Sequence, residues 1–82
     1  MNANRIETVQ GLSVVALTRY LMKKYNILQD VAFARLLSTE LYMLLMDPET
    51  NLYLETNDYL CQACDVEAKD GKDALYRFIN EE

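Results

Sequence analysis

The feature that most constrains the fold of this chain is its low content of turn-forming residues: its 82 residues include two glycines and one proline. Tight β-hairpins depend on glycine-containing turns, so a sandwich or barrel of short strands is disfavoured. Long stretches are rich in Leu, Ala, Met, Glu, Lys and Arg, which favour helix. Hydrophobic residues make up 51% of the chain, which is typical of a packed domain. We expect a single all-α domain over residues 1–82, a small bundle of four to five short helices.

Apolar residues recur at helical spacing along most of the chain, and this recurrence locates the helices. A turn and a short extended segment or pinned loop interrupt the pattern near the middle. The helical segments are expected at residues 4–25, 28–37, 40–46, 56–71 and 72–79, with the turn at 47–51 and the extended segment or loop at 51–55.

Capping and breaking residues mark the expected helix ends. Asn26 is the expected N-cap of the second helix, and Ser38-Thr39 offers the N-cap of the third. Asp47-Pro48 stops the third helix because proline disfavours helix at the residue before it. Gly71 suits the left-handed residue that closes a helix, and Gly11 marks a point where the first helix could bend.

The inner faces of these helices predict the hydrophobic core. In the first helix the spacing selects one face, made of Ile6, Val9, Leu12, Ala16, Leu17, Tyr20, Leu21 and Tyr25. The residues expected in the core of the whole domain are Val15, Leu17, Leu21, Leu36, Leu41, Leu44, Leu45, Leu60, Val66, Leu75 and Phe78.

Charge is unevenly distributed along the chain. Lys plus Arg is 8 and Asp plus Glu is 13, but residues 1–35 carry a net charge of +3 and residues 36–82 a net charge of −8. A negative overall field repels phosphate backbones, so we expect no nucleic-acid partner. Arg19, Lys23 and Lys24 complement the dipole at the end of the first helix. Contact of this basic patch with nucleic acid stays open as an alternative.

No segment predicts a membrane span or an export signal. The longest uncharged runs, residues 8–18 and 41–46, are shorter than the roughly 18 apolar residues that a spanning helix needs. Glu7 and Gln10 interrupt any signal-type apolar run at the N-terminus. We expect a soluble, cytoplasmic protein with no membrane partner.

The residues available for chemistry exclude most enzyme classes. The chain has no histidine, which is the commonest general base and metal ligand. Cys61 and Cys64 form a CxxC string, but neither the four ligands of a zinc site nor the strand-to-helix context of a redox pair accompanies it. Asp65, Glu67 and Asp70 match no calcium-loop spacing. We expect no catalytic residue, no metal and no cofactor, and two reduced thiols.

Residues 41–60 hold more apolar side chains than one face of a short helix needs. A chain of this size buries only about 60% of its unfolded surface, so such a cluster is hard to bury within one protomer. Tyrosine and methionine are enriched at protein interfaces. The alternative is that the helix at 40–46 is simply the central core helix. We predict that the contact residues for a protein partner are Tyr42, Met43, Met46, Tyr53 and Tyr59.

Three stretches carry a family resemblance: Ser38-Thr39-Glu40-Leu41-Tyr42, residues 45–53, and Asp58-Tyr59-Leu60. Together they resemble a class of short bacterial proteins of unknown function, over most of residues 13–79. The resemblance implies a small helical cytoplasmic protein, and some members of the class look like the antitoxin or regulatory half of a gene pair with a larger partner. It implies no catalytic residue, and Cys61 and Cys64 stand outside the shared pattern.

Two functions from different classes follow. The leading one is a non-catalytic protein-interaction module that forms a homodimer or neutralises a partner encoded nearby. The alternative is a small-ligand- or metal-responsive regulatory domain that uses Cys61 and Cys64.

Overall fold

The longest element is α1 (Ala3–Tyr25), which is capped by an asparagine at each end. The Asn2 side chain accepts a hydrogen bond from the Arg5 backbone N–H at 3.0 Å, which satisfies one of the free donors of the first turn. Asn26 ends the helix in the left-handed conformation and donates its N–H to the Met22 carbonyl. The helix runs unbroken through Gly11. The computed structural model describes residues 2–81.

Two short helices follow α1, namely α2 (Gln29–Leu37) and α3 (Glu40–Met46). The predicted N-cap at Asn26 is wrong: Leu28 holds that position without a side-chain hydrogen bond, and Asn26 caps α1 instead. Asparagine tolerates positive φ, so it serves the C-cap as readily as the N-cap. Thr39 caps α3 as predicted, because its hydroxyl oxygen accepts from the Tyr42 N–H.

The segment between α3 and α4 folds as two 3-10 turns, η1 (Pro48–Thr50) and η2 (Leu52–Leu54). Leu52 and Tyr53 are buried, so the segment is pinned to the core, as the loop alternative described, and is not extended. The Thr50 hydroxyl donates to the Leu44 carbonyl at 2.6 Å and ties the turn to the end of α3.

The chain closes with a helical hairpin of α4 (Asn57–Asp70) and α5 (Lys72–Asn80). Thr56 caps α4 by accepting from the Tyr59 N–H. Gly71 joins the two helices at φ 89° and ψ 178°, a region that only glycine occupies readily. The prediction of a left-handed residue at Gly71 is right in the sign of φ but wrong in conformation, because ψ is extended.

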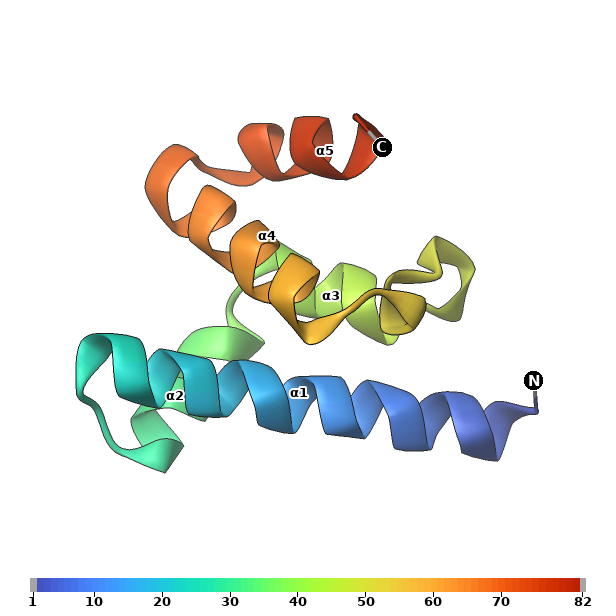
Figure 1. Cartoon of the computed structure of the whole chain (residues 1–82), viewed down its shortest axis with the longest axis horizontal. Helices are drawn as coiled ribbons and strands as arrows, with labels where there is room; N and C mark the ends of the chain where they lie inside the picture. The colour runs from blue at the N-terminus through green and yellow to red at the C-terminus, as the bar shows by residue number, and fades with distance from the viewer. Residues whose placement is uncertain (1, 82) are drawn as a thin grey trace.

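The helices are stacked, with α3 and α4 between α1 and α5 (Figure 1). Every expected helix is present, so the domain is all-α, and residues 2–81 contain no strand. Within those residues no helix is both long enough and apolar enough to cross a bilayer.

The core gathers side chains from all five helices and from η2. Leu44 and Phe78, both predicted to be buried, pack against it while partly exposed, and Val66 is half-buried. The prediction for Val15 is wrong, because this side chain is 47% exposed. Successive helical residues turn by 100°, so Val15 points away from the face that buries Leu17. The core consists of Leu17, Leu21, Ala32, Leu36, Leu41, Leu45, Leu52, Tyr53, Leu60, Ala63, Cys64 and Leu75.

Side chains from neighbouring helices hold α3 at both ends. The Glu67 carboxylate on α4 accepts the backbone N–H groups of Glu40 and Leu41, at 2.8 and 2.9 Å. At the other end the buried Gln10 amide on α1 donates to the Leu45 carbonyl at 3.2 Å. These bonds satisfy groups that a helix leaves unpaired at its ends, and they connect α1 to α3 and α3 to α4.

Candidate interaction surface

The structure separates the five predicted contact residues. Met43 is 63% exposed on α3, and Met46 is also exposed. Tyr42 and Tyr59 are half-buried, and the Tyr59 ring packs against Phe78 at 5.1 Å between centroids. Tyr53 lies in the core. The two methionines are therefore the predicted residues most open to a partner.

The apolar surplus of residues 41–60 is largely absorbed within the chain. Leu41 and Leu45 form the inner face of α3, and Leu52 and Leu60 pack on it from η2 and α4. This is the arrangement of a central core helix, the alternative that the sequence left open.

Large exposed hydrophobic side chains gather instead on α1, α2 and the loop between them. Seven of the eleven in the described part of the chain lie between residues 12 and 37, which puts the larger apolar surface on this helical hairpin. They are Leu12, Val15, Tyr25, Leu28, Val31, Phe33 and Leu37.

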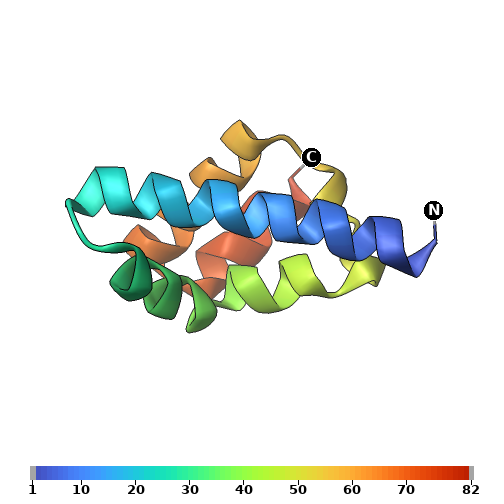
Figure 2. The same ribbon diagram turned by 90° about the horizontal axis from the view of Figure 1, so that it is seen from below.

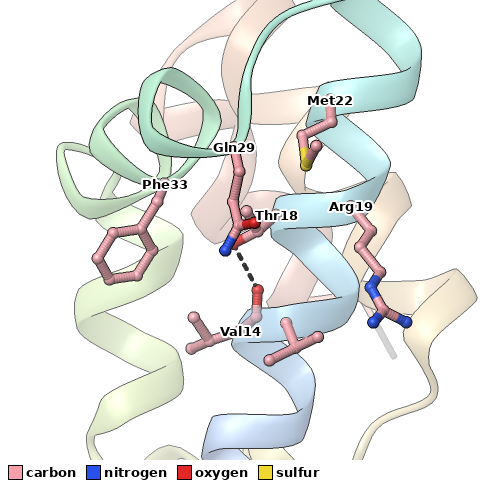
Figure 3. A pocket seen from close by; sticks show the side chains of 7 residues that line it. Val14, Thr18, Arg19, Met22, Gln29 and Phe33 are labelled. Atoms are coloured by element: carbon pink, nitrogen blue, oxygen red, sulfur yellow. Dashed lines mark hydrogen bonds between the residues drawn. The ribbon is translucent and has the colours of Figure 1, made fainter.

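A hollow of about 510 Å³ lies between α1 and α2. Phe33 and Gln29 reach it from α2, and Val14 and Met22 line it from α1 (Figure 3). The Thr18 hydroxyl on its floor donates to the Val14 carbonyl at 2.8 Å, so this buried polar group is satisfied within α1. Four of the seven lining residues are apolar, and the polar ones are Thr18, Arg19 and Gln29.

The outer face of α1 continues this hollow. Residues seven apart lie nearly above one another on a helix, and Thr8, Val15 and Met22 form one such row. The adjacent row is Arg5, Leu12 and Arg19, with Leu12 65% exposed. Seen from below, α1 crosses the front of the molecule and no other element covers it (Figure 2).

We call the outer face of α1 together with this hollow the α1–α2 surface. It combines exposed apolar side chains with a few polar and basic ones. Its residues are Arg5, Thr8, Gly11, Leu12, Val14, Val15, Thr18, Arg19, Met22, Lys23, Gln29 and Phe33.

Basic side chains in α1 divide into two groups. Lys24 forms an ion pair with Asp65 of α4, and the Tyr20 hydroxyl donates to the same carboxylate. Burial alone would raise the pKa of Asp65, but the hydrogen bonds from Lys24 and Tyr20, with the lysine charge, outweigh it and lower this pKa. Arg5, Arg19 and Lys23 are exposed and have no ion-pair partner among residues 2–81.

Both cysteines have free thiols, and their surroundings disfavour the thiolate. Burial, reinforced by the Asp65 charge, raises the pKa of Cys64 to about 11 and also raises the pKa of Cys61. The thiolate is the nucleophilic form of cysteine, so a raised pKa lowers the reactivity of both thiols. No group of three Cys, Asp or Glu side chains suited to a metal ion forms within residues 2–81.

No protein-family model, curated protein or solved structure matches this chain. The surface must therefore be interpreted from its own residues.

Sequence reasoning missed the α1–α2 surface because it assigned too much of α1 to the core. The sequence predicts Leu12 on the inner face of the first helix and Val15 in the core, yet both are exposed. The heptad row of Thr8, Val15 and Met22 was the available signal, since a polar residue in line with Val15 indicates an outward face.

Proposed function

We propose that this chain is a non-catalytic protein-interaction module whose contact surface is the α1–α2 surface. The observation that carries the proposal is the exposure of Leu12, Val15 and Phe33 beside an apolar hollow. Exposed apolar side chains that gather on one surface usually mark a protein interaction site.

The shape of this surface favours a protein partner over a small ligand. It follows α1, whose 23 residues extend over about 35 Å at 1.5 Å per residue. The hollow opens along its side, with both Val15 and Phe33 exposed at its walls. A small molecule is normally buried over most of its surface, whereas a protein segment can cover an open strip of this length.

The proposal replaces much of the contact set predicted from the sequence. Met43 and Met46 remain exposed on α3, which packs beside α1, so they could extend the contact. The resemblance to antitoxin-like bacterial proteins favours a partner encoded nearby. A regulatory metal site at Cys61 and Cys64 has less support, because both thiol pKa values are raised and no third ligand joins the two cysteines within residues 2–81.

The test is co-purification of the tagged full chain from its native host, with stoichiometry read by native mass spectrometry. The variant pair Leu12→Ser and Val15→Ser removes apolar area from the proposed surface. Leu54→Ser is the matched control, because Leu54 is 60% exposed on η2, outside the α1–α2 surface. Circular dichroism checks that every variant keeps its helix content.

We expect the wild type and Leu54→Ser to retain a stoichiometric partner, and the Leu12 and Val15 variants to lose most of it. Each substitution should weaken binding about tenfold, as expected for loss of an interface residue worth more than about 1 kcal/mol. Equal recovery of the partner with all variants would show that the contact surface lies elsewhere than on α1. Recovery of only the monomeric chain would contradict the interaction module itself.

A further inference from the structure

Gly11 lies on the exposed side of α1, one turn before Val14 and Val15, and the fold gives no reason for a glycine there. Its backbone is helical, and a side-chain carbon built on it would meet no atom within 4 Å. Glycine destabilises a helix interior relative to alanine. Leu12 and Val15, both exposed, lie beside it. A missing side chain beside two exposed apolar ones leaves room for another backbone to approach α1 closely.

The positive charges of α1 that have no ion-pair partner among residues 2–81 lie on one side of this face. Arg5 and Arg19 lie two heptads apart in the same row as Leu12, and Lys23 follows Arg19 by one turn. The three cations extend over about 27 Å of α1, from its first turn to its last. Glu7, the acid of this helix, lies toward α3, where it lines a separate hollow with Met46. The outer face of α1 is thus an apolar strip bordered on one side by unpaired positive charge, and on the other side by Glu7 near its N-terminal end.

A second copy of the chain is a poor occupant for this face. A two-fold symmetric dimer presents the same patch from both subunits. Residues 1–35 carry a net charge of +3, so a dimer through α1 would place like charges against each other. The charge instead complements an acidic partner.

We infer that the α1–α2 surface binds an amphipathic helix with an acidic flank, supplied by a partner protein and lying along α1 with its closest approach at Gly11. This inference rests on the proposed function and names the partner's chemistry. Apolar residues of the partner helix cover Leu12 and Val15 and enter the hollow beside Phe33. Its carboxylates pair with Arg5, Arg19 and Lys23.

The test uses a displayed library of amphipathic helices of about 18 residues, the length that matches the span of the three cations. The apolar positions are fixed as Leu and Ala, and the polar positions vary among Glu, Lys and Gln. The full chain selects binders, and fluorescence anisotropy measures their affinity at about 50 and about 300 mM salt. The variants are Arg19→Glu, Gly11→Leu and Gly11→Ala, with Leu54→Ser as control.

We expect glutamate-rich helices to be selected and their affinity to fall about tenfold at the higher salt. Arg19→Glu should weaken binding about tenfold or more, because it replaces an attraction by a repulsion. Gly11→Leu should abolish binding while helix content is retained, and Gly11→Ala should weaken binding although it favours the helix. Leu54→Ser should bind as the wild type does.

Selection of neutral or basic helices, or acidic binders insensitive to Arg19→Glu and Gly11→Leu, would overturn the inference, as would selection of no helix at all. A wild-type dimer in solution that Leu12→Ser abolishes would assign the face to a second copy and also overturn it. Co-purification judges the proposed function separately. If a host partner co-purifies only when Leu12 is intact but does not need Arg19, the proposed interaction module stands and the acidic helix is rejected as its ligand.

Discussion

The Asp65 carboxylate on α4 connects this helix to α1, which is far from it in the sequence. Its carboxylate accepts hydrogen bonds from Lys24 and Tyr20 of α1, each at 2.5 Å. These bonds and the lysine charge lower the pKa of Asp65 despite the opposing effect of burial. A carboxyl whose folded pKa is lowered adds stability above its unfolded pKa of about 3.9, and loses it as pH falls through the folded value.

We therefore expect the urea midpoint of the wild type to fall more steeply between about pH 5 and about pH 2 than that of Asp65→Asn. The difference should be small, because both side chains of the ion pair are more than one third exposed. Tyr20→Phe, which removes one of the two hydrogen bonds, should fall between them. Identical acid profiles for wild type and Asp65→Asn would show that Asp65 does not link α1 to α4 in solution.

Stability at alkaline pH tests the same residues, and there the stabilisation is lost as pH rises, not as it falls. The hydrogen bond to Asp65 is the main cause that raises the pKa values of Lys24 and Tyr20. A raised folded pKa adds stability below the unfolded value, near pH 10 for both groups, and loses it as pH rises through the folded value. The loss of stability at alkaline pH should therefore be absent in Asp65→Asn.

At the scale of the helices, the two glycines should respond in opposite directions to alanine. Gly11→Ala should stabilise the isolated chain by about 0.5–1 kcal/mol, because alanine favours helix and its side chain meets no neighbour. Gly71→Ala should destabilise it by about 1–3 kcal/mol, because φ 89° strains any other residue. Thermal melts should show a higher Tm for the first variant and a lower one for the second. A lower Tm for Gly11→Ala would mean that the glycine has a structural role in the free chain.

The positions of the helices were largely predictable, and their exposed faces were less so. Periodic apolar residues and the caps Thr39 and Thr56 located the helices to within a few residues. Asn26 was misassigned because one residue type serves both ends of a helix. Val15 was misplaced because α1 has apolar residues on both sides, and only the packing of α2 and α4 decides which side is inner.

At the scale of the whole molecule, the contacts that assemble α3 could not be inferred from the sequence. Gln10 and Glu67 lie 35 and 26 residues from the α3 groups they bind. No pattern around Glu67 indicates that its carboxylate caps a helix in another part of the chain. Local patterns do not encode such pairings, which arise only once α1, α3 and α4 pack together.

These pairings should make α3 unfold together with the rest of the chain. Glu67→Ala leaves the N–H groups of Glu40 and Leu41 without their acceptor, at a cost of about 1–3 kcal/mol. In a chain of this size that corresponds to a Tm lower by about 4–8 °C for each kcal/mol. Glu67→Gln, which keeps one oxygen acceptor, should lose less stability, and Gln62→Ala on the exposed side of α4 should change stability little.

Because α3 lies between α1 and α4, circular dichroism and tyrosine fluorescence should report one shared transition in every variant. A separate early transition in Glu67→Ala would instead show that α3 unfolds alone and that the remaining helices form a stable domain without it.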